Sequence, residues 1–489
     1  MKLGKREKII HLYNRFGLGA SEAEIEEGMG VGVDGTLDRL LNYEKTPFEF
    51  PVSVWEFVFY GDDKVAMDVG RVAQWWVLRM IATPRPLEEK LTLFWHSHFA
   101  VSGSKSEFGP MMFAYLNTLR AHAGGSFLSL LNEVSKSPAM VHWLDCDRSL
   151  KGRPNENFAR ELMELFTMGI GNYTEKDVQE AARAFSGWSI RYPYYELGKV
   201  KETDRVRFGV QHEMPLVVFQ DSPELHDNGE KTYLGQKGAF TAEEILEMAA
   251  RHPATAARTC RKLWEFFAYQ NPEPAVVERL AKVFKKNDLQ IKPVLQAIAD
   301  SREFWGEQCV GTMVKSPVDF AVGAMRQVEA SARMLRLRIL YASYDTPIEG
   351  TLNNDAYAVR RNMADQGLSL LFPPDVSGWK WGPAWATAAG AIDRIRFADY
   401  LFSNRKGGPP AVALRDRLMK EATGASPDQI VDRLLTALAT PLSSEKKAIL
   451  VSACTKAGGA KALAKAATAN TLLRNLTQLA FAAPEYHLC

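Results

Sequence analysis

Apolar residues recur at helical spacing along most of the chain, and this pattern predicts a mostly α-helical protein. The clearest segments are 86–103, 155–168 and 174–186. In each of them, apolar residues three and four positions apart form one buried face. Pro86 is suited to the first turn of a helix, Gly169 is suited to the end of one, and Thr174 with Asp177 three residues later is typical of an N-terminal cap.

The helical period is lost between about residues 189 and 235, where short aromatic and β-branched stretches such as YPYYELGKV and RVRFGV alternate with polar turns. Such stretches are typical of short strands. Helical spacing resumes at Thr241 and continues to about Leu340, and residues 353–382, rich in Pro, Gly and Trp towards their end, read as an irregular segment. The sequence NRKGGPP at 404–410 reads as a linker. The prediction is a multi-helical array or bundle over 1–403 with a small β insertion, and an Ala- and Leu-rich helical tail over 404–489 packed on it.

Composition narrows the class of protein. The 489 residues include 60 basic and 58 acidic side chains, a net charge of +2, so nothing favours a nucleic-acid partner. The sequence contains no run of eighteen apolar residues, so it predicts no membrane span. Its N-terminus lacks the apolar stretch of a signal peptide, and we therefore expect a cytoplasmic protein. The five scattered cysteines contain no CxxC pair, which favours free thiols.

Polar side chains concentrate inside two helical segments that otherwise look like core. In the 86–103 segment His98 shares the apolar face with Phe94, and His96 points to the other side. In the 155–168 segment Asn157, Glu161 and Glu164 form a row at spacings of four and three residues. Carboxylate, carboxamide and imidazole groups are ligands of divalent metals. The predicted ligands of a divalent metal ion of unknown identity are therefore His96, His98, Asn157, Glu161 and Glu164. A core histidine and a surface polar row are the alternatives.

A second group of residues has the chemistry of acid–base or anion-stabilising groups. Its members are Arg160, Asp177, Arg183, His226 and Asp227. The structural alternatives remain open, because Glu156, Arg160 and Glu164 have the spacing of a surface ion-pair ladder. Likewise, HDNG at 226–229 has the composition of an Asx turn.

Tryptophans mark a third group. The segment FPPDVSGWKWGPAW, residues 372–385, is a stiff loop with three tryptophans and Asp375. Tryptophan faces suit sugars and other flat apolar surfaces. The predicted substrate-binding residues are Trp188, Asp375, Trp379 and Trp381, and the alternative is a loop that only fills space between helical layers. No phosphate loop, dinucleotide fingerprint, HExxH or GxSxG motif is found.

Several long motifs resemble the DUF1800 family of bacterial proteins, which has no established biochemical function. They are HLYNRFGLG (11–19), FWHSHFAVS (94–102), SPAMVHWLD (137–145), NENFARELMELFTMGIGNYTEKDV (155–178), ARAFSGW (182–188), HDNGEKTYLG (226–235), the short KLW (262–264) and FPPDVSGW (372–379). The resemblance implies a mostly α-helical fold. It also implies an exported or periplasmic location in many members and a DUF1501-type protein partner, which is similar to sulfatases and alkaline phosphatases.

Two functional hypotheses follow. In the first, the protein is a metal-dependent hydrolase whose site lies between helices, where the metal activates a water molecule and polarises the substrate. The small-molecule or glycan substrate is not specified by any motif. In the second, the protein is a non-catalytic helical scaffold, and the same polar motifs are buried networks that fix how the helices pack.

Overall fold

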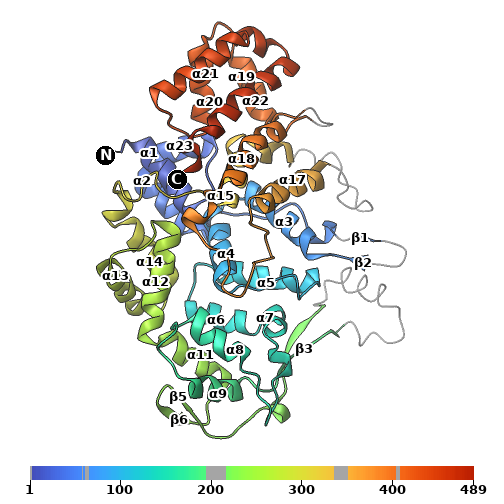
Figure 1. The fold of residues 1–489 in the computed structure, drawn as a ribbon, viewed down its shortest axis with the longest axis vertical. Coiled ribbons are helices and arrows are strands. Elements are labelled where there is room, and N and C mark those ends of the chain that lie inside the picture. The colour runs from blue at the N-terminus through green and yellow to red at the C-terminus, as the bar shows by residue number, and fades with distance from the viewer. Residues whose placement is uncertain (1–2, 58, 61–64, 194–215, 335–350, 404–407) are drawn as a thin grey trace.

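The predicted fold class is confirmed. The computed structural model describes residues 3–57, 59–60, 65–193, 216–334, 351–403 and 408–489, and these are mostly helical (Figure 1). The helices are α1 (Lys5–Phe16), α2 (Glu22–Leu41), α3 (Val69–Ala82), α4 (Pro86–His98), α5 (Gly109–His122), α6 (Phe127–Ser135), α7 (Pro138–Trp143), α8 (Asn157–Glu161), α9 (Glu175–Ala184), α11 (Ala242–Arg251), α12 (Pro253–Phe267), α13 (Pro274–Lys286), α14 (Ile291–Ala299), α15 (Pro317–Gln327), α17 (Thr351–Asp365), α18 (Ala388–Leu401), α19 (Val412–Glu421), α20 (Pro427–Ala437), α21 (Ser444–Lys456), α22 (Ala466–Ala482) and α23 (Pro484–His487).

Strands are short and come in antiparallel pairs. The pairs are β1 (Phe59–Tyr60) with β2 (Val65–Ala66), β3 (Trp188–Arg191) with β4 (Val218–Asp221), and β5 (Lys231–Tyr233) with β6 (Gln236–Gly238). The last two pairs lie at the predicted β insertion. The central part of that insertion, 194–215, which holds most of YPYYELGKV and all of RVRFGV, lies outside the described residues.

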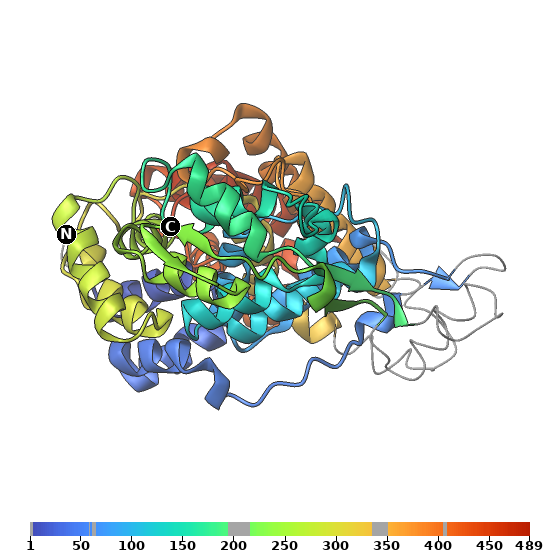
Figure 2. The ribbon, with the colours of Figure 1, turned by 90° about the horizontal axis from the view of Figure 1, so that it is seen from below.

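Helix α4 lies in the interior, and every residue of it is buried. It contacts α1, α2 and α5, and Phe94 meets Phe266 of α12. Figure 1 shows α19–α22 at one end of the molecule and α9 with β5 and β6 at the other. From below, α13 lies on one side and β1–β2 on the opposite side (Figure 2). Helix α4 ends at His98 and is shorter than the predicted segment 86–103. Phe99 leaves helical geometry, and its carbonyl accepts a hydrogen bond from the Tyr115 hydroxyl.

The prediction of an irregular segment over 353–382 is wrong in its first part, because α17 covers Thr351–Asp365. The Gly, Pro and Trp residues that suggested irregular backbone all come after Asp365.

The prediction of one continuous helix over 155–168 is also wrong. Helix α8 ends at Glu161 and is followed by a wider π-helical turn, η4 (Leu162–Phe166). The Thr167 hydroxyl donates to the carbonyl of Leu162, and Gly169 N–H donates to the carbonyl of Met163 at 2.8 Å. A π turn holds an extra residue per turn, so the polar row that a regular helix would align is rotated after Glu161.

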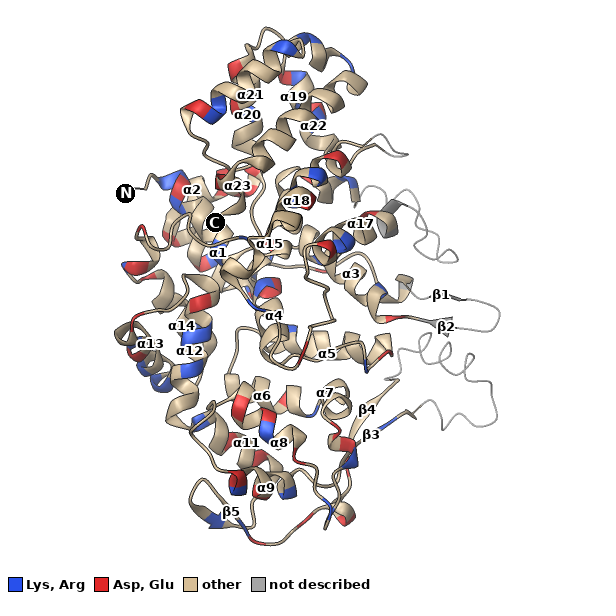
Figure 3. Cartoon of the chain, viewed as in Figure 1, with Lys and Arg blue, Asp and Glu red and all other residues tan. Residues whose placement is uncertain are grey.

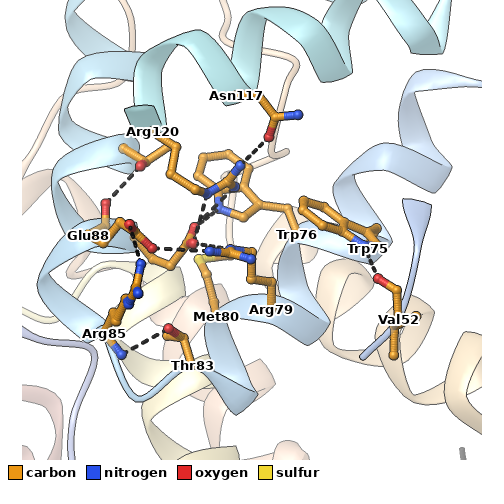
Figure 4. A network of polar contacts seen from close by, with 12 residues as sticks. Val52, Trp75, Trp76, Arg79, Met80, Thr83, Arg85, Glu88, Asn117 and Arg120 are labelled. Carbon is orange, nitrogen blue, oxygen red and sulfur yellow. Dashed lines mark hydrogen bonds and ion pairs between the residues drawn. The ribbon is translucent and has the colours of Figure 1, made fainter. Parts of the chain in front are cut away.

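A buried carboxylate, Glu89, joins helices α3, α4 and α5 through a polar network whose members Trp76, Arg79 and Arg120 are labelled in Figure 4. Glu89 of α4 is 0 % exposed. It accepts from Arg120 of α5 at 2.8 Å, from the indole N–H of Trp76 of α3 at 2.7 Å, and from Arg79. Burial raises the pKa of Glu89, and Arg120 and Arg79 outweigh this and hold it below its ordinary value. The network fixes α4, which carries both histidines of the FWHSHF motif.

The tail packs on the preceding helices. Helix α22 contacts α18 and α19, and Leu488 forms an isolated β-bridge with Val314. Positively and negatively charged residues are interspersed over the described chain (Figure 3). Among the helices of the described residues, none combines the length and the apolar character that crossing a membrane requires.

Candidate functional site

A pocket of about 180 Å³ opens beside α4, between α12 and the loop of residues 372–385, called the tryptophan loop below. Its lining combines aromatic walls with a few polar groups, as small-molecule sites do. The lining residues are Phe94, Ser97, His98, Lys262, Glu265, Phe266, Gln270, Ser377, Trp379 and Trp381. His98, Trp379 and Trp381 were predicted as site residues, and the structure brings these three together.

The polar centre of the pocket is a pair formed by Lys262 of α12 and His98 of α4. The Nζ atom of Lys262 lies 3.1 Å from His98 Nδ1, and His98 Nε2 lies 3.0 Å from the carbonyl oxygen of Phe166. A carbonyl only accepts, so Nε2 carries the imidazole proton and Nδ1 is left to accept from the lysine. The partner of Lys262 is therefore a neutral acceptor, which provides no charge to balance an ammonium group.

This environment shifts both groups toward their uncharged forms. Burial, and then the positive charge of Arg258 one helical turn earlier, lower the pKa of Lys262 to about 7. Burial and the neighbouring Lys262 hold the pKa of His98 well below its ordinary value. Desolvation and like charge both disfavour a cation. At neutral pH a large fraction of Lys262 is therefore an uncharged amine.

Glu265 supplies a carboxyl group to the same pocket, three residues after Lys262. Burial raises its pKa, against the lowering influence of its backbone hydrogen bond at Asn271 and of Arg261. Gln270 also lines the pocket, and its amide donates to the Glu265 carbonyl at 2.9 Å. A lysine of lowered pKa beside a carboxyl of raised pKa is an arrangement suited to proton transfer.

The tryptophan wall is attached to α4 through Ser97. The Ser97 hydroxyl accepts from the backbone N–H of Trp379 at 3.2 Å and from the indole N–H of Trp381 at 3.1 Å. Gly378 lies against the same residue, and a Cβ there would be 2.0 Å from the Ser97 carbonyl oxygen. Only glycine fits this position, so the loop is held close to the helix.

His96 lies on the other side of α4 and is fully buried. Its Nε2 accepts from the backbone N–H of Leu371 at 3.1 Å, and its ring meets the edge of Trp379 at 5.2 Å between centroids. Burial lowers the pKa of His96 to about 3, so the ring is neutral. His96 thus supports the tryptophan loop from behind, separately from His98.

In the described structure the residues predicted as metal ligands are not gathered into one group. Both nitrogens of His98 are used by Phe166 and Lys262, and His96 accepts from Leu371. Asn157 is exposed. Throughout the described part of the chain, no three His, Cys, Asp or Glu side chains gather as a metal site requires. The extra residue of the π turn removes the regular-helix geometry on which the predicted row depended.

The two predicted carboxylates of this segment, Glu161 and Glu164, act on each other, and Glu164 has a further partner. Glu164 accepts from the Tyr173 hydroxyl at 3.1 Å. Burial, and then the charge of Glu164, raise the pKa of Glu161. Arg160 pairs with Glu156 at 3.0 Å and with Glu175 at 2.8 Å. The arginine therefore forms one step of the alternative surface ladder and a second contact with α9.

The predicted acid–base residues of 177–227 join α9 to the β5 segment. Arg183 contacts Asp227 through Nε at 2.8 Å and through a terminal nitrogen at 3.2 Å. Asp177 caps α9 through Thr174 and accepts from the backbone N–H of Leu234 at 2.7 Å. His226 Nδ1 lies 3.0 Å from the Ser186 carbonyl. These contacts fit the alternative in which the motifs fix the packing of elements.

Asp227 gives this network a pH dependence. Its hydrogen bond to Arg183 lowers the pKa of Asp227 from 3.8 to about 2. A lowered folded-state pKa stabilises the fold above the unfolded-state value and ceases to do so as pH falls through the folded value. We expect the free energy of unfolding to decrease between about pH 4 and pH 2, and Asp227→Asn to flatten that slope. Urea unfolding at several pH values measures this pH dependence in the wild-type protein and in Asp227→Asn. The same decrease of the free energy of unfolding in both proteins would contradict the prediction.

Two predicted substrate-binding residues lie away from the pocket lining. Trp188 packs against Phe158, Phe185 and Phe219 and is buried. Asp375 is exposed and accepts from the backbone N–H of Ser377 at 2.8 Å, which makes it a turn residue. The tryptophan loop therefore combines the two alternatives: Trp379 and Trp381 line a pocket, and Asp375 shapes the turn before it.

The polar residues that sequence reasoning missed are Ser97, Lys262, Glu265, Gln270 and Ser377. One signal for Lys262 was present: Arg258 and Lys262 are like charges four residues apart on a helix, a spacing that is unfavourable on a solvated surface. No sequence signal pairs Lys262 with His98, which is 164 positions away.

The fold and the pocket define a mostly α-helical protein with an aromatic, lysine-containing site against a buried central helix. The family described as "Protein of unknown function (DUF1800)" matches residues 11–488. The chain therefore belongs to the DUF1800 family over nearly its whole length, as its motifs predict. No curated protein and no solved structure matches it.

Proposed function

We propose that the protein is an enzyme that acts on a small organic molecule in the pocket between α4, α12 and the tryptophan loop, with the Lys262 amine as its reactive group. One observation carries the proposal. Lys262 donates to a neutral imidazole within an aromatic pocket, and in the described structure no carboxylate lies within ion-pair distance of it, although the charge of Glu265 acts on it from the same lining. Lysines used as bases or nucleophiles are made uncharged by such desolvation.

Each part of the pocket supports this chemistry. The His98 acceptor orients one N–H of Lys262, so the lone pair of the uncharged amine is available to a bound molecule. The faces of Trp379 and Trp381 suit a flat apolar portion of that molecule. Glu265, with its raised pKa, is a proton donor on the same lining.

The scaffold hypothesis is a second candidate, and a specific observation favours it. Arg183, Asp227 and Asp177 are engaged in contacts that join α9 to β5. Those contacts explain the polar motifs of 174–235 without catalysis. They leave the Lys262 pocket unexplained, since burying an amine whose direct partner is a neutral imidazole costs free energy that a purely structural site would avoid.

The metal-dependent hydrolase and the DUF1501-type partner remain predictions. The donor set described above gives the metal no support, and elemental analysis of chelator-free protein tests it. Co-purification with a DUF1501-type protein tests the partner.

The charge state of Lys262 is a direct test of the proposed function. We expect its acetylation rate, measured by mass spectrometry after pulses of acetic anhydride, to rise with a midpoint near pH 7 and then level off. An ordinary lysine amine gains reactivity up to about pH 10.4. In Arg258→Met the midpoint should move upward, because one of the causes of the lowered pKa is removed. A wild-type midpoint in the ordinary lysine range would overturn the proposal.

A further inference from the structure

We infer that Lys262 forms a covalent imine with an uncharged aldehyde or ketone that carries a flat apolar group, an inference that rests on the proposed function. The inference combines three features of the pocket: a nucleophile at its polar centre, a fixed acceptor beside it, and aromatic walls around it. It names the class of molecule that the pocket accepts.

The orientation of Lys262 favours attack on a carbonyl carbon. Its contact with His98 Nδ1 uses one N–H, and the tautomer of His98 is fixed by the Phe166 carbonyl, so the imidazole stays an acceptor. A protonated imine at Nζ also carries an N–H. The same 3.1 Å contact with His98 can therefore hold the amine before reaction and the iminium after it.

The reaction balances without any further reagent. The amine nitrogen forms a bond to the carbonyl carbon as the carbonyl π bond opens onto oxygen. One hydrogen of the amine nitrogen passes to that oxygen. The C–O bond then breaks, and the oxygen leaves as water with this hydrogen and one proton from the carboxyl group of Glu265, which leaves an iminium that keeps one N–H and a Glu265 carboxylate. Glu265 lines the same pocket and is the proton donor to the departing oxygen. Neither oxidation nor reduction occurs.

The walls restrict which carbonyl compound fits. Phe94, Phe266 and Trp381 contribute apolar surface, and the ring of Phe266 meets Trp381 edge-on at 4.8 Å between centroids. The volume of about 180 Å³ is below that of typical drug-sized sites. The charge of Arg258 reaches Lys262, but Arg258 does not line the pocket, and its Nη2 atom donates to the carbonyl of Leu165 at 3.4 Å, so it does not contact a carboxylate of a bound molecule. The pocket therefore favours a small uncharged compound over an oxo acid.

Reductive trapping tests the inference. The full-length protein is incubated at pH 7 with benzaldehyde or acetophenone and sodium cyanoborohydride, which converts an imine to a stable secondary amine, and the modified lysines are mapped by mass spectrometry. We expect Lys262 to be modified at least tenfold faster than the exposed Lys285, and faster with these probes than with pyruvate. Lys262→Met should lose the fast modification, and Lys285→Met should keep it. Trp381→Ala, at a half-exposed position, should reduce the preference for the aromatic probes.

The outcomes separate this inference from the proposed function. Modification of Lys262 no faster than that of Lys285 overturns the imine. If acetylation of Lys262 still has a midpoint near pH 7, the reactive amine stands and acts on another class of molecule. If both measurements fail, the proposed function falls as well. A preference for pyruvate would overturn the assignment of an uncharged compound.

Discussion

Glu89→Gln is expected to lower the free energy of unfolding by about 3–5 kcal/mol, the usual cost of breaking a buried ion pair by removing one partner. The carboxylate is 0 % exposed and accepts from Arg79, Arg120 and Trp76. Glutamine has nearly the same shape but no charge, so Arg120 would stay buried beside a neutral amide, while Arg79 would keep only its pair with Glu88 at 3.1 Å. Urea unfolding of the two proteins measures the difference.

Glu156→Gln is the matched control. Glu156 also pairs with an arginine, Arg160, at 3.0 Å, but its side chain is 39 % exposed. Exposed ion pairs contribute about 0–1 kcal/mol. If Glu89→Gln costs no more than Glu156→Gln, the buried network does not stabilise α4, and the precise placement of His96 and His98 needs another cause.

Much of the fold could be predicted because its signals are local. The cap formed by Thr174 and Asp177 is present, with the Thr174 hydroxyl accepting from the Asp177 N–H, and α11 begins after Thr241 as expected. The π turn at Leu162–Phe166 could not be predicted in this way. Its hydrogen bonds involve Thr167 and Gly169, and nothing in a pattern of apolar spacing distinguishes it from a regular turn.

The candidate site was predicted only in part, for a related physical reason. Helical projection placed His98 on a buried face, and the structure agrees. The choice of its partners requires tertiary contacts, and those contacts bring a lysine and a backbone carbonyl to the imidazole instead of the carboxylates of 155–168. A histidine buried in an apolar stripe must have hydrogen-bond partners, but the sequence does not say which distant groups provide them.

Gly378→Ala is expected to open the pocket wall and to destabilise the protein by clearly more than the strain of a left-handed alanine, which is about 1–2 kcal/mol. Gly378 has φ +80°, and an added Cβ would lie 2.0 Å from the Ser97 carbonyl oxygen. That oxygen belongs to the backbone of a buried helix and cannot give way. The loop must therefore move, and the hydrogen bonds of Trp379 and Trp381 to the Ser97 hydroxyl break with it.

Gly424→Ala separates the clash from the strain. Gly424 has φ +75°, and no atom lies within 4 Å of its added Cβ, so this variant pays for the left-handed backbone alone. We expect Gly378→Ala to lose more free energy of unfolding than Gly424→Ala. We also expect the acetylation midpoint of Lys262 to rise only in Gly378→Ala, because a displaced wall admits water and weakens the desolvation that lowers the pKa of that amine. Equal losses and an unchanged midpoint would show that the tryptophan loop does not enclose Lys262.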